Sequence, residues 1–140
     1  MMNSKKNRPD ALLLETPVNG HRQAALHFLE LVASGNVVEA YQRYAAPNGR
    51  HHNLYFRAGF PALQKGMQEN HDQFPNMRLT VKNVIGEGDL VAVHSQVVQS
   101  PSEKGMAAVH IFRFQGGKIV EFWDCGEPVP ADSPNEDGMF

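Results

Sequence analysis

The chain of 140 residues has one cysteine, Cys125, and no long hydrophobic run. A single thiol excludes an intrachain disulfide and a cysteine metal cluster. Apolar runs of only a few residues exclude a transmembrane helix and leave no hydrophobic segment suited to a signal peptide. The net charge is −2, with no basic cluster, so the signature of a nucleic-acid-binding protein is missing as well. We therefore expect a cytoplasmic protein with no nucleic-acid or membrane partner.

Hydrophobic residues make up 41% of the sequence, which is ordinary for a globular protein. The length fits one domain with a core of its own. Residues 1–17 are mostly polar and end in Pro17, and we interpret them as an N-terminal arm. Residues 18–140 would then form a single domain that ends in a proline-containing tail.

Three segments in the first half of the chain carry apolar side chains at helical spacing. Asn19 and Asn36 are suitable N-caps for the first two helices, and Gly35 can end the first one. The third helix is predicted from Phe60 to Phe74. Between the second and third helices, Pro47-Asn48-Gly49 predicts a turn.

After Pro75, apolar and polar residues alternate, which indicates strands. Two strands are predicted over 77–85 and 90–99. A β-hairpin follows from His110 to Asp124, with Gly116-Gly117 in its turn. Helices followed by an antiparallel meander predict an α+β fold.

The register of this hairpin decides which side chains share a face. If residues 115–117 form a three-residue loop, His110 lies opposite Phe122. One face then carries His110, Phe112, Phe122 and Asp124, and the other carries Val109, Ile111, Ile119 and Trp123. A two-residue turn would instead move Asp124 to the face opposite His110. An ionisable pair in apolar surroundings is a candidate acid–base site.

Apolar residues occur on both faces of the last three predicted strands, and the helices can cover only one face. The residues left without a covering layer are Val91, Val93, Ile111, Ile119 and Trp123. A second copy of the sheet is the simplest cover, so we expect a homodimer through the sheet face.

Several segments together resemble the SnoaL-like polyketide cyclases, which share a cone-shaped α+β superfamily with ketosteroid isomerase and nuclear transport factor two. These segments are His52-Asn53, Gly88–His94, Ile111–Phe114, Gly117–Asp124 and Gly138–Phe140. The resemblance covers roughly residues 18–140. It implies a strongly bent antiparallel sheet packed against three N-terminal helices, a cone with an internal pocket. It also implies cofactor-independent acid–base chemistry on a small carbonyl, polyketide-like substrate.

On this resemblance, the predicted catalytic residues are Asp124, His94 and His110. Asp124 would move a proton, and the two histidines would tune it or hold a developing enolate oxygen. The predicted substrate-binding residues are His52, Asn53, Phe112 and Phe122. No histidine pair has the spacing of a hydrolytic zinc site, so we expect no metal and no cofactor. The alternative is a mixed metal site built from His52, His94, His110 and Asp124.

The chain departs from the usual pattern of these relatives. His110 stands where they usually carry Asp, Phe122 where they carry His, and Leu54 where they often carry Pro. Three classes of function therefore remain. One is an enzyme for aldol condensation, cyclisation, isomerisation or a related proton transfer. Another is a non-catalytic module that binds an apolar small molecule in the same pocket. The third is a pure interaction protein with a filled pocket.

Overall fold

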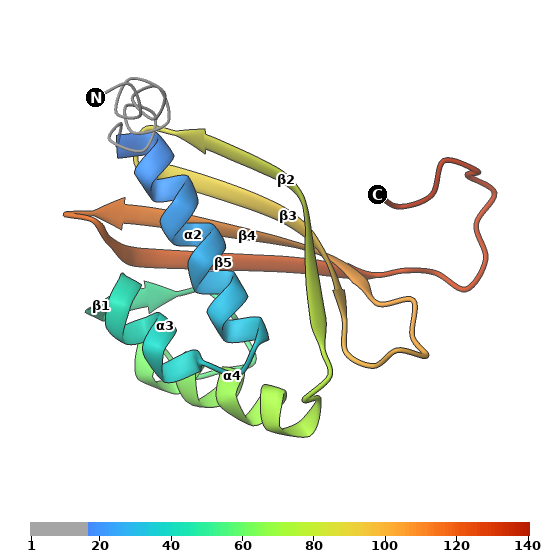
Figure 1. The fold of residues 1–140 in the computed structure, drawn as a ribbon, viewed down its shortest axis with the longest axis horizontal. Coiled ribbons are helices and arrows are strands. Elements are labelled where there is room, and N and C mark those ends of the chain that lie inside the picture. Colours follow the sequence, from blue (N-terminus) through green and yellow to red (C-terminus); the bar gives the residue numbers. More distant parts are fainter. Residues whose placement is uncertain (1–16) are drawn as a thin grey trace, which may run out of the picture.

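The computed structural model describes residues 17–140, so most of the predicted N-terminal arm lies outside the described residues. Within these residues, three helices and five strands follow one another. Figure 1 shows how they are arranged. They are α2 (Pro17–Ala33), α3 (Val37–Tyr44), β1 (Ala45–His51), α4 (Phe60–Gln73), β2 (Arg78–Glu87), β3 (Leu90–Val98), β4 (Met106–Gln115) and β5 (Lys118–Pro128). The predicted α+β class is confirmed.

The helices lie close to their predicted positions, with differences at the caps. α2 begins at Pro17, so Asn19 lies inside the helix, where its Oδ1 accepts a hydrogen bond from Arg22. Gly35, with φ of 89°, follows the end of α2 as predicted. Asn36 is the N-cap of α3 as predicted, although its side chain makes no capping hydrogen bond.

The sheet has the strand order β1-β5-β4-β3-β2. Neighbouring strands are antiparallel except β1 and β5, which are parallel, so the sheet is mostly antiparallel rather than wholly so. The turn predicted at Pro47-Asn48-Gly49 is wrong, because these residues lie inside β1. β1 is an edge strand whose pairing is irregular between Ala45 and Arg50, a position where a sheet tolerates proline.

The hairpin of β4 and β5 has a two-residue turn, so the predicted three-residue loop is wrong. Gly116 and Gly117 have φ of 58° and 78°, the positive values that a type I′ turn requires. Val120 has no partner in β4 and forms a β-bulge in β5. The shorter turn and the bulge each shift the register by one residue, so the partner of His110 moves from the predicted Phe122 to Asp124, and His110 and Asp124 lie side by side on one face.

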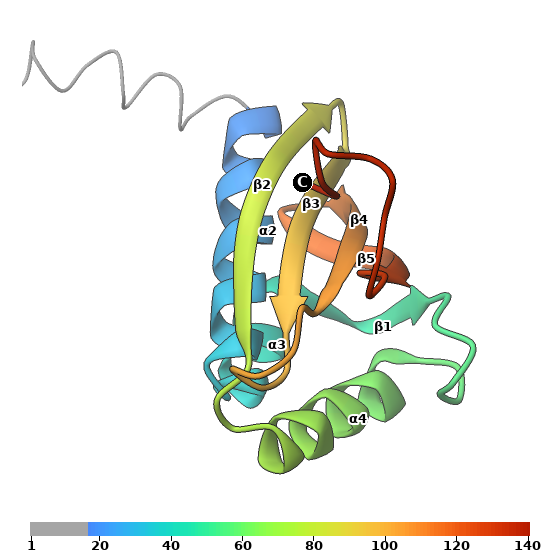
Figure 2. The same cartoon turned by 90° about the vertical axis from the view of Figure 1, so that its right-hand side faces the viewer.

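The core lies between the helices and the face of the sheet that carries Phe112 and Phe122, here called the inner face. Val91 and Val93 are fully buried on it, and Ile119 is 1% exposed. The prediction that these three residues need cover from a second chain is therefore wrong. Figure 2 shows α2 along one side of the sheet and the C-terminal tail on the other, outer side. Of the five residues predicted to need that cover, Ile111 and Trp123 are the two on the outer face.

Candidate active site

Asp124 lies half-buried on the inner face of β5, and the turn that follows β1 reaches it. Asn53 in this turn donates a hydrogen bond from Nδ2 to Asp124 Oδ2 over 3.0 Å. The Asn53 Oδ1 atom accepts a hydrogen bond from the backbone N–H of Tyr55 over 3.0 Å. This second bond fixes which end of the amide faces the carboxylate, so Asn53 is a hydrogen-bond donor to Asp124.

His51 supports the same turn, and the sequence analysis assigned it no role. Its Nε2 lies 2.7 Å from the carbonyl oxygen of Arg57, which only accepts, so Nε2 carries the proton. Its Nδ1 accepts the backbone N–H of Asn53 over 3.1 Å. His51 is thus held as the neutral imidazole, and it fixes the backbone from which Asn53 reaches Asp124.

His110 projects from β4 on the inner face, opposite Asp124, and stacks on Phe122 with 5.6 Å between ring centroids. Burial lowers the pKa of His110 to about 4, although the nearby charge of Asp124 acts in the opposite direction. The imidazole is therefore neutral at pH 7. Its buried Nδ1 has no hydrogen-bond partner among residues 17–140, so a polar atom of this group is unpaired.

Aromatic side chains pack beside His110 on the inner face. Phe112 is fully buried, and its ring packs against those of Phe28 and Phe122. Tyr41 donates its hydroxyl to Met67 Sδ over 3.2 Å. Burial raises the pKa of Tyr41 above its ordinary range, and the charge of Asp124 adds to the effect. The phenol thus stays protonated within the field of the same carboxylate.

Ser95 is a second polar residue that the sequence analysis did not identify as part of the site. It is fully buried on the inner face of β3, opposite Ala108 and therefore diagonal to His110. Its hydroxyl, like His110 Nδ1, has no hydrogen-bond partner in the described part of the chain. The sequence could not predict that the hydroxyl of Ser95 is unpaired, because residue types alone do not show which polar atoms find a partner.

His94 does not belong to this group, so its predicted proximity to His110 and Asp124 is wrong. It pairs with Val109 across β3 and β4, which places it on the outer face. There its Nδ1 lies 3.0 Å from Asn83 Nδ2, and its ring stacks on Phe140. The face was misjudged because the loop between β3 and β4 sets the register of the two strands, and sequence alternation does not reveal it.

His52 also lies on the outer face, so the structure does not bring it together with Asp124 and His110. It stacks on Trp123 with 5.1 Å between centroids, and its Nε2 lies 2.7 Å from Glu121 Oε2. This hydrogen bond, helped by the charge of Arg50, lowers the pKa of Glu121. Arg113 completes the outer cluster by donating to Glu121 and by lying over the Trp123 ring.

The separation of these residues between two faces bears on the metal alternative. His52 and His94 lie on the outer face, while His110 and Asp124 lie on the inner one, so the proposed four-residue metal site is not assembled. Within residues 17–140, no group of three or more His, Cys, Asp and Glu side chains is placed to hold a metal ion. In the same part of the chain, no helix is long and apolar enough to cross a membrane.

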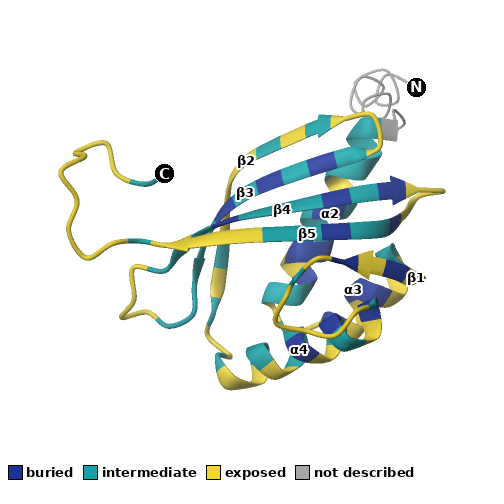
Figure 3. Cartoon of the chain, turned by 180° about the vertical axis from the view of Figure 1, so that it is seen from behind, coloured by how far each residue is buried: buried dark blue, intermediate teal, exposed yellow. Residues whose placement is uncertain are grey.

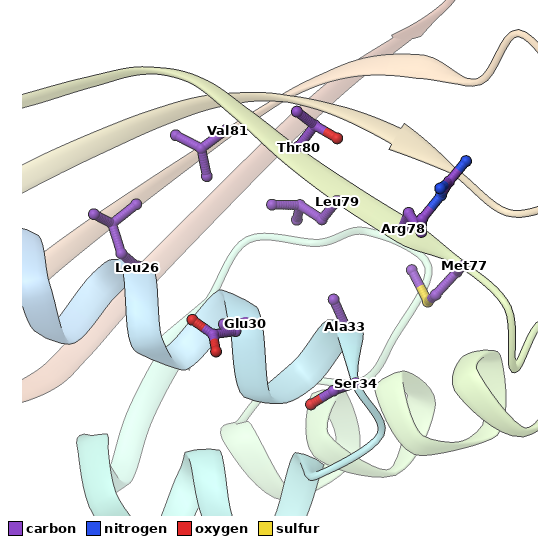
Figure 4. A pocket seen from close by; sticks show the side chains of 9 residues that line it. All are labelled: Leu26, Glu30, Ala33, Ser34, Met77, Arg78, Leu79, Thr80 and Val81. Atoms are coloured by element: carbon purple, nitrogen blue, oxygen red, sulfur yellow. The ribbon is translucent and has the colours of Figure 1, made fainter.

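A groove of about 560 Å³ opens between α2 and the start of β2 (Figure 4). Its lining residues are Leu26, Glu30, Ala33, Ser34, Met77, Arg78, Leu79, Thr80 and Val81. None of the predicted site residues is among them. This groove is therefore separate from the group formed by Asp124, Asn53 and His110.

The sequence matches the SnoaL-like domain over residues 25–122. No curated protein matches it at a significant level. Many solved structures share its fold. One is an NTF2-like protein of unknown function from Cytophaga hutchinsonii, with 17% identity and a TM-score of 0.64, where the match covers 77% of this chain and 90% of the other.

Two Streptomyces proteins show the same similarity of fold. The candidate polyketide cyclase IdmH from Streptomyces antibioticus is 23% identical, with a TM-score of 0.60 over 76% of this chain and 91% of IdmH. The candidate hydroxylase AclR from Streptomyces galilaeus is 21% identical, with a TM-score of 0.66 over 79% of this chain and 90% of AclR. At these identities the comparisons establish the fold alone.

Proposed function

The chain belongs to the family of SnoaL-like domains, and on this basis we propose that it is a cofactor-independent enzyme that moves a proton at a carbon next to a carbonyl group. Such a step begins an aldol condensation, a cyclisation or an isomerisation. The substrate would be a small carbonyl compound with an apolar body.

A single observation carries the proposal: the carboxylate of Asp124 is held in place by Asn53 on the largely apolar inner face, opposite the neutral imidazole of His110. Asn53 binds Oδ2 of Asp124, while Oδ1 has no hydrogen-bond partner among residues 17–140. A positioned carboxylate with one free oxygen suits a general base, because it is within reach of a substrate without having to break another bond.

The chemistry follows from these positions. Asp124 would accept a proton from the carbon next to the carbonyl, the electron pair of the C–H bond would form a C=C bond, and the π pair of the carbonyl would move onto its oxygen. Neutral His110 would donate an N–H to that oxygen as it becomes an enolate. The enolate carbon would then attack a second carbonyl, and the oxygen of that carbonyl would take the proton from Asp124. In an isomerisation, the substrate would carry a neighbouring double bond, and the dienolate would take the proton back from Asp124 at its γ carbon. His94 and His52, on the outer face, have no part in this sequence.

The experiment that tests the proposal is deuterium exchange, followed by NMR in deuterated water across a panel of ketones and diketones. Wild-type protein should accelerate exchange at the carbon next to the carbonyl for at least one compound. Ligand-observed NMR on the same samples reports binding separately.

A binding module is the second candidate, favoured by one observation. Phe122, 2% exposed, puts a ring with no titratable group where relatives usually carry His. Compounds that bind without any exchange would support this second function against the enzymatic one.

A further inference from the structure

The turn between β1 and α4 exposes two large apolar side chains beside the candidate site. Leu54 is 95% exposed and Tyr55 is 94% exposed. Figure 3 shows this turn in the exposed colour, below β5 and next to α4. Adjacent large apolar residues left fully in water mark a contact surface more often than a single exposed one does.

The turn is not a loose segment, because hydrogen bonds and packing fix it on both sides. His51 donates to the carbonyl of Arg57, and the N–H of Phe56 donates to the carbonyl of Asn53 over 3.3 Å. The Phe56 ring lies so close to Gly66 of α4 that a Cβ added there would come within 2.2 Å of it. Leu54 and Tyr55 are therefore presented by a fixed frame, which reduces the entropy lost when a ligand binds.

The same turn connects these exposed side chains to the carboxylate. Asn53, whose side chain donates to Asp124, immediately precedes Leu54 in the chain. A ligand whose polar end lies at Asp124 and whose apolar end extends toward solvent would pass this turn. A rigid aromatic side chain such as Tyr55 favours a flat ring as its contact.

We propose that Leu54 and Tyr55 form an apolar subsite, which binds an aromatic ring carried by the carbonyl substrate outside the polar part of the site. The proposal rests on the proposed function for the position of the carbonyl group. It adds a ring-binding surface made from two exposed side chains of the turn.

The size of the surface favours a small molecule over a protein. Two side chains of this kind offer on the order of 300 Å² of apolar surface. A stable protein interface needs roughly 800 Å² from each partner. Arg50 in β1 is already paired with Glu121. The turn itself holds one Lys or Arg, the exposed Arg57, and the attraction that one such charge has for an anionic membrane is small.

The test compares 2-acetylnaphthalene with acetone as probes, and full-length wild type with a Leu54→Ser/Tyr55→Ser double variant. Val38→Ser, at a 51% exposed position on α3, is the matched control. Dissociation constants come from ligand-observed NMR. The double variant should bind 2-acetylnaphthalene about tenfold more weakly, as expected for loss of apolar contact area. Its binding of acetone and its melting temperature should not change, and Val38→Ser should behave as wild type.

Equal binding of 2-acetylnaphthalene by wild type and the double variant would overturn the subsite, as would no binding by wild type at millimolar concentration. A double variant that instead loses self-association, or loses binding to phosphatidylserine vesicles, would also overturn it and assign the turn to another partner. Deuterium exchange separates this result from the proposed function. Ring-dependent binding through the turn, without any exchange, would keep the subsite and reject the enzymatic function.

Discussion

Among the single residues, His110 has a charge state that its burial determines. Its neutral form fits the inner face, and its pKa of about 4 lies below the value of 6.5 for a free side chain. Between these two values the unfolded chain binds a proton that the folded chain does not, so acid favours unfolding there. Above pH 6.5 neither state is protonated, and the effect is absent.

This difference predicts a fall in the free energy of unfolding between about pH 6.5 and pH 4, on the order of 2–3 kcal/mol. Urea denaturation across this range measures it. In a His110→Phe variant the free energy of unfolding should no longer fall between pH 6.5 and pH 4. In the control His94→Phe, on the outer face, it should fall as in wild type. Below pH 4.5 the free energy of unfolding should fall further in both variants. The fold lowers the pKa of Glu121, so the unfolded chain takes up a proton on this residue more readily than the folded chain does. Parallel curves for His110→Phe and wild type would refute this account of His110.

Residue identity alone predicted part of the site. Asp124, His110, Phe112 and Phe122 share one face as expected, and Asn53 reaches that face from its turn. His94 and His52 were misplaced because a strand's alternation says which residues share a face, but not which face meets the helices. His51 was overlooked because its role depends on hydrogen bonds to the backbone of Asn53 and Arg57, which have no sequence signature.

Among the elements, the turn between β1 and α4 joins the site to α4. Gly66 lies in the middle of that helix, buried under the Phe56 ring. Periodicity predicted the helix itself, but the contact was invisible in the sequence, where a glycine inside a helix reads only as a weak helix former. Likewise, β1 was missed because Pro47-Asn48-Gly49 has the composition of a turn, and only pairing with β5 makes it a strand.

The Gly66→Ala variant should therefore change the geometry of the site without lowering the stability of the fold. Alanine favours the helix by about 1 kcal/mol over glycine, while its Cβ must displace the half-exposed Phe56 ring. We expect an unchanged or slightly higher melting temperature together with weaker deuterium exchange, since the turn that positions Asn53 loses its support. Phe56→Ala is the control, because it removes the same packing without adding a methyl group. Full exchange activity in both variants would show that this packing does not position the site.

At the scale of the whole molecule, the outer face decides the assembly. Ile111 and Trp123 remain on it, although His52 covers part of Trp123 and Phe140 of the tail packs on His94. Of the five residues from which the sequence predicted a dimer, Val91, Val93 and Ile119 lie in the core of a single chain. Only Ile111 and Trp123 still support a dimer interface on the outer face. A homodimer through the rest of this face stays our proposal.

Light scattering should then give about twice the chain mass of 15.6 kDa at micromolar concentration. Ile111→Glu should produce a monomer or an aggregate, because it buries a charge in the proposed interface. Val38→Glu, on α3 away from the sheet, should leave the mass unchanged. A monomeric wild type would reject the dimer without affecting the site, because Asp124, Asn53 and His110 all come from one chain.

The most direct measurement is the rate of deuterium exchange for Asp124→Asn, on a ketone that wild type exchanges. Asparagine has nearly the shape of aspartate but cannot accept a proton as a base. The rate should fall by roughly a hundredfold or more, with little change in binding of the ketone or in melting temperature. Glu127→Gln, an exposed carboxylate later in β5, should exchange at the wild-type rate. An Asp124→Asn variant that exchanges as fast as wild type would contradict the claim that Asp124 moves the proton.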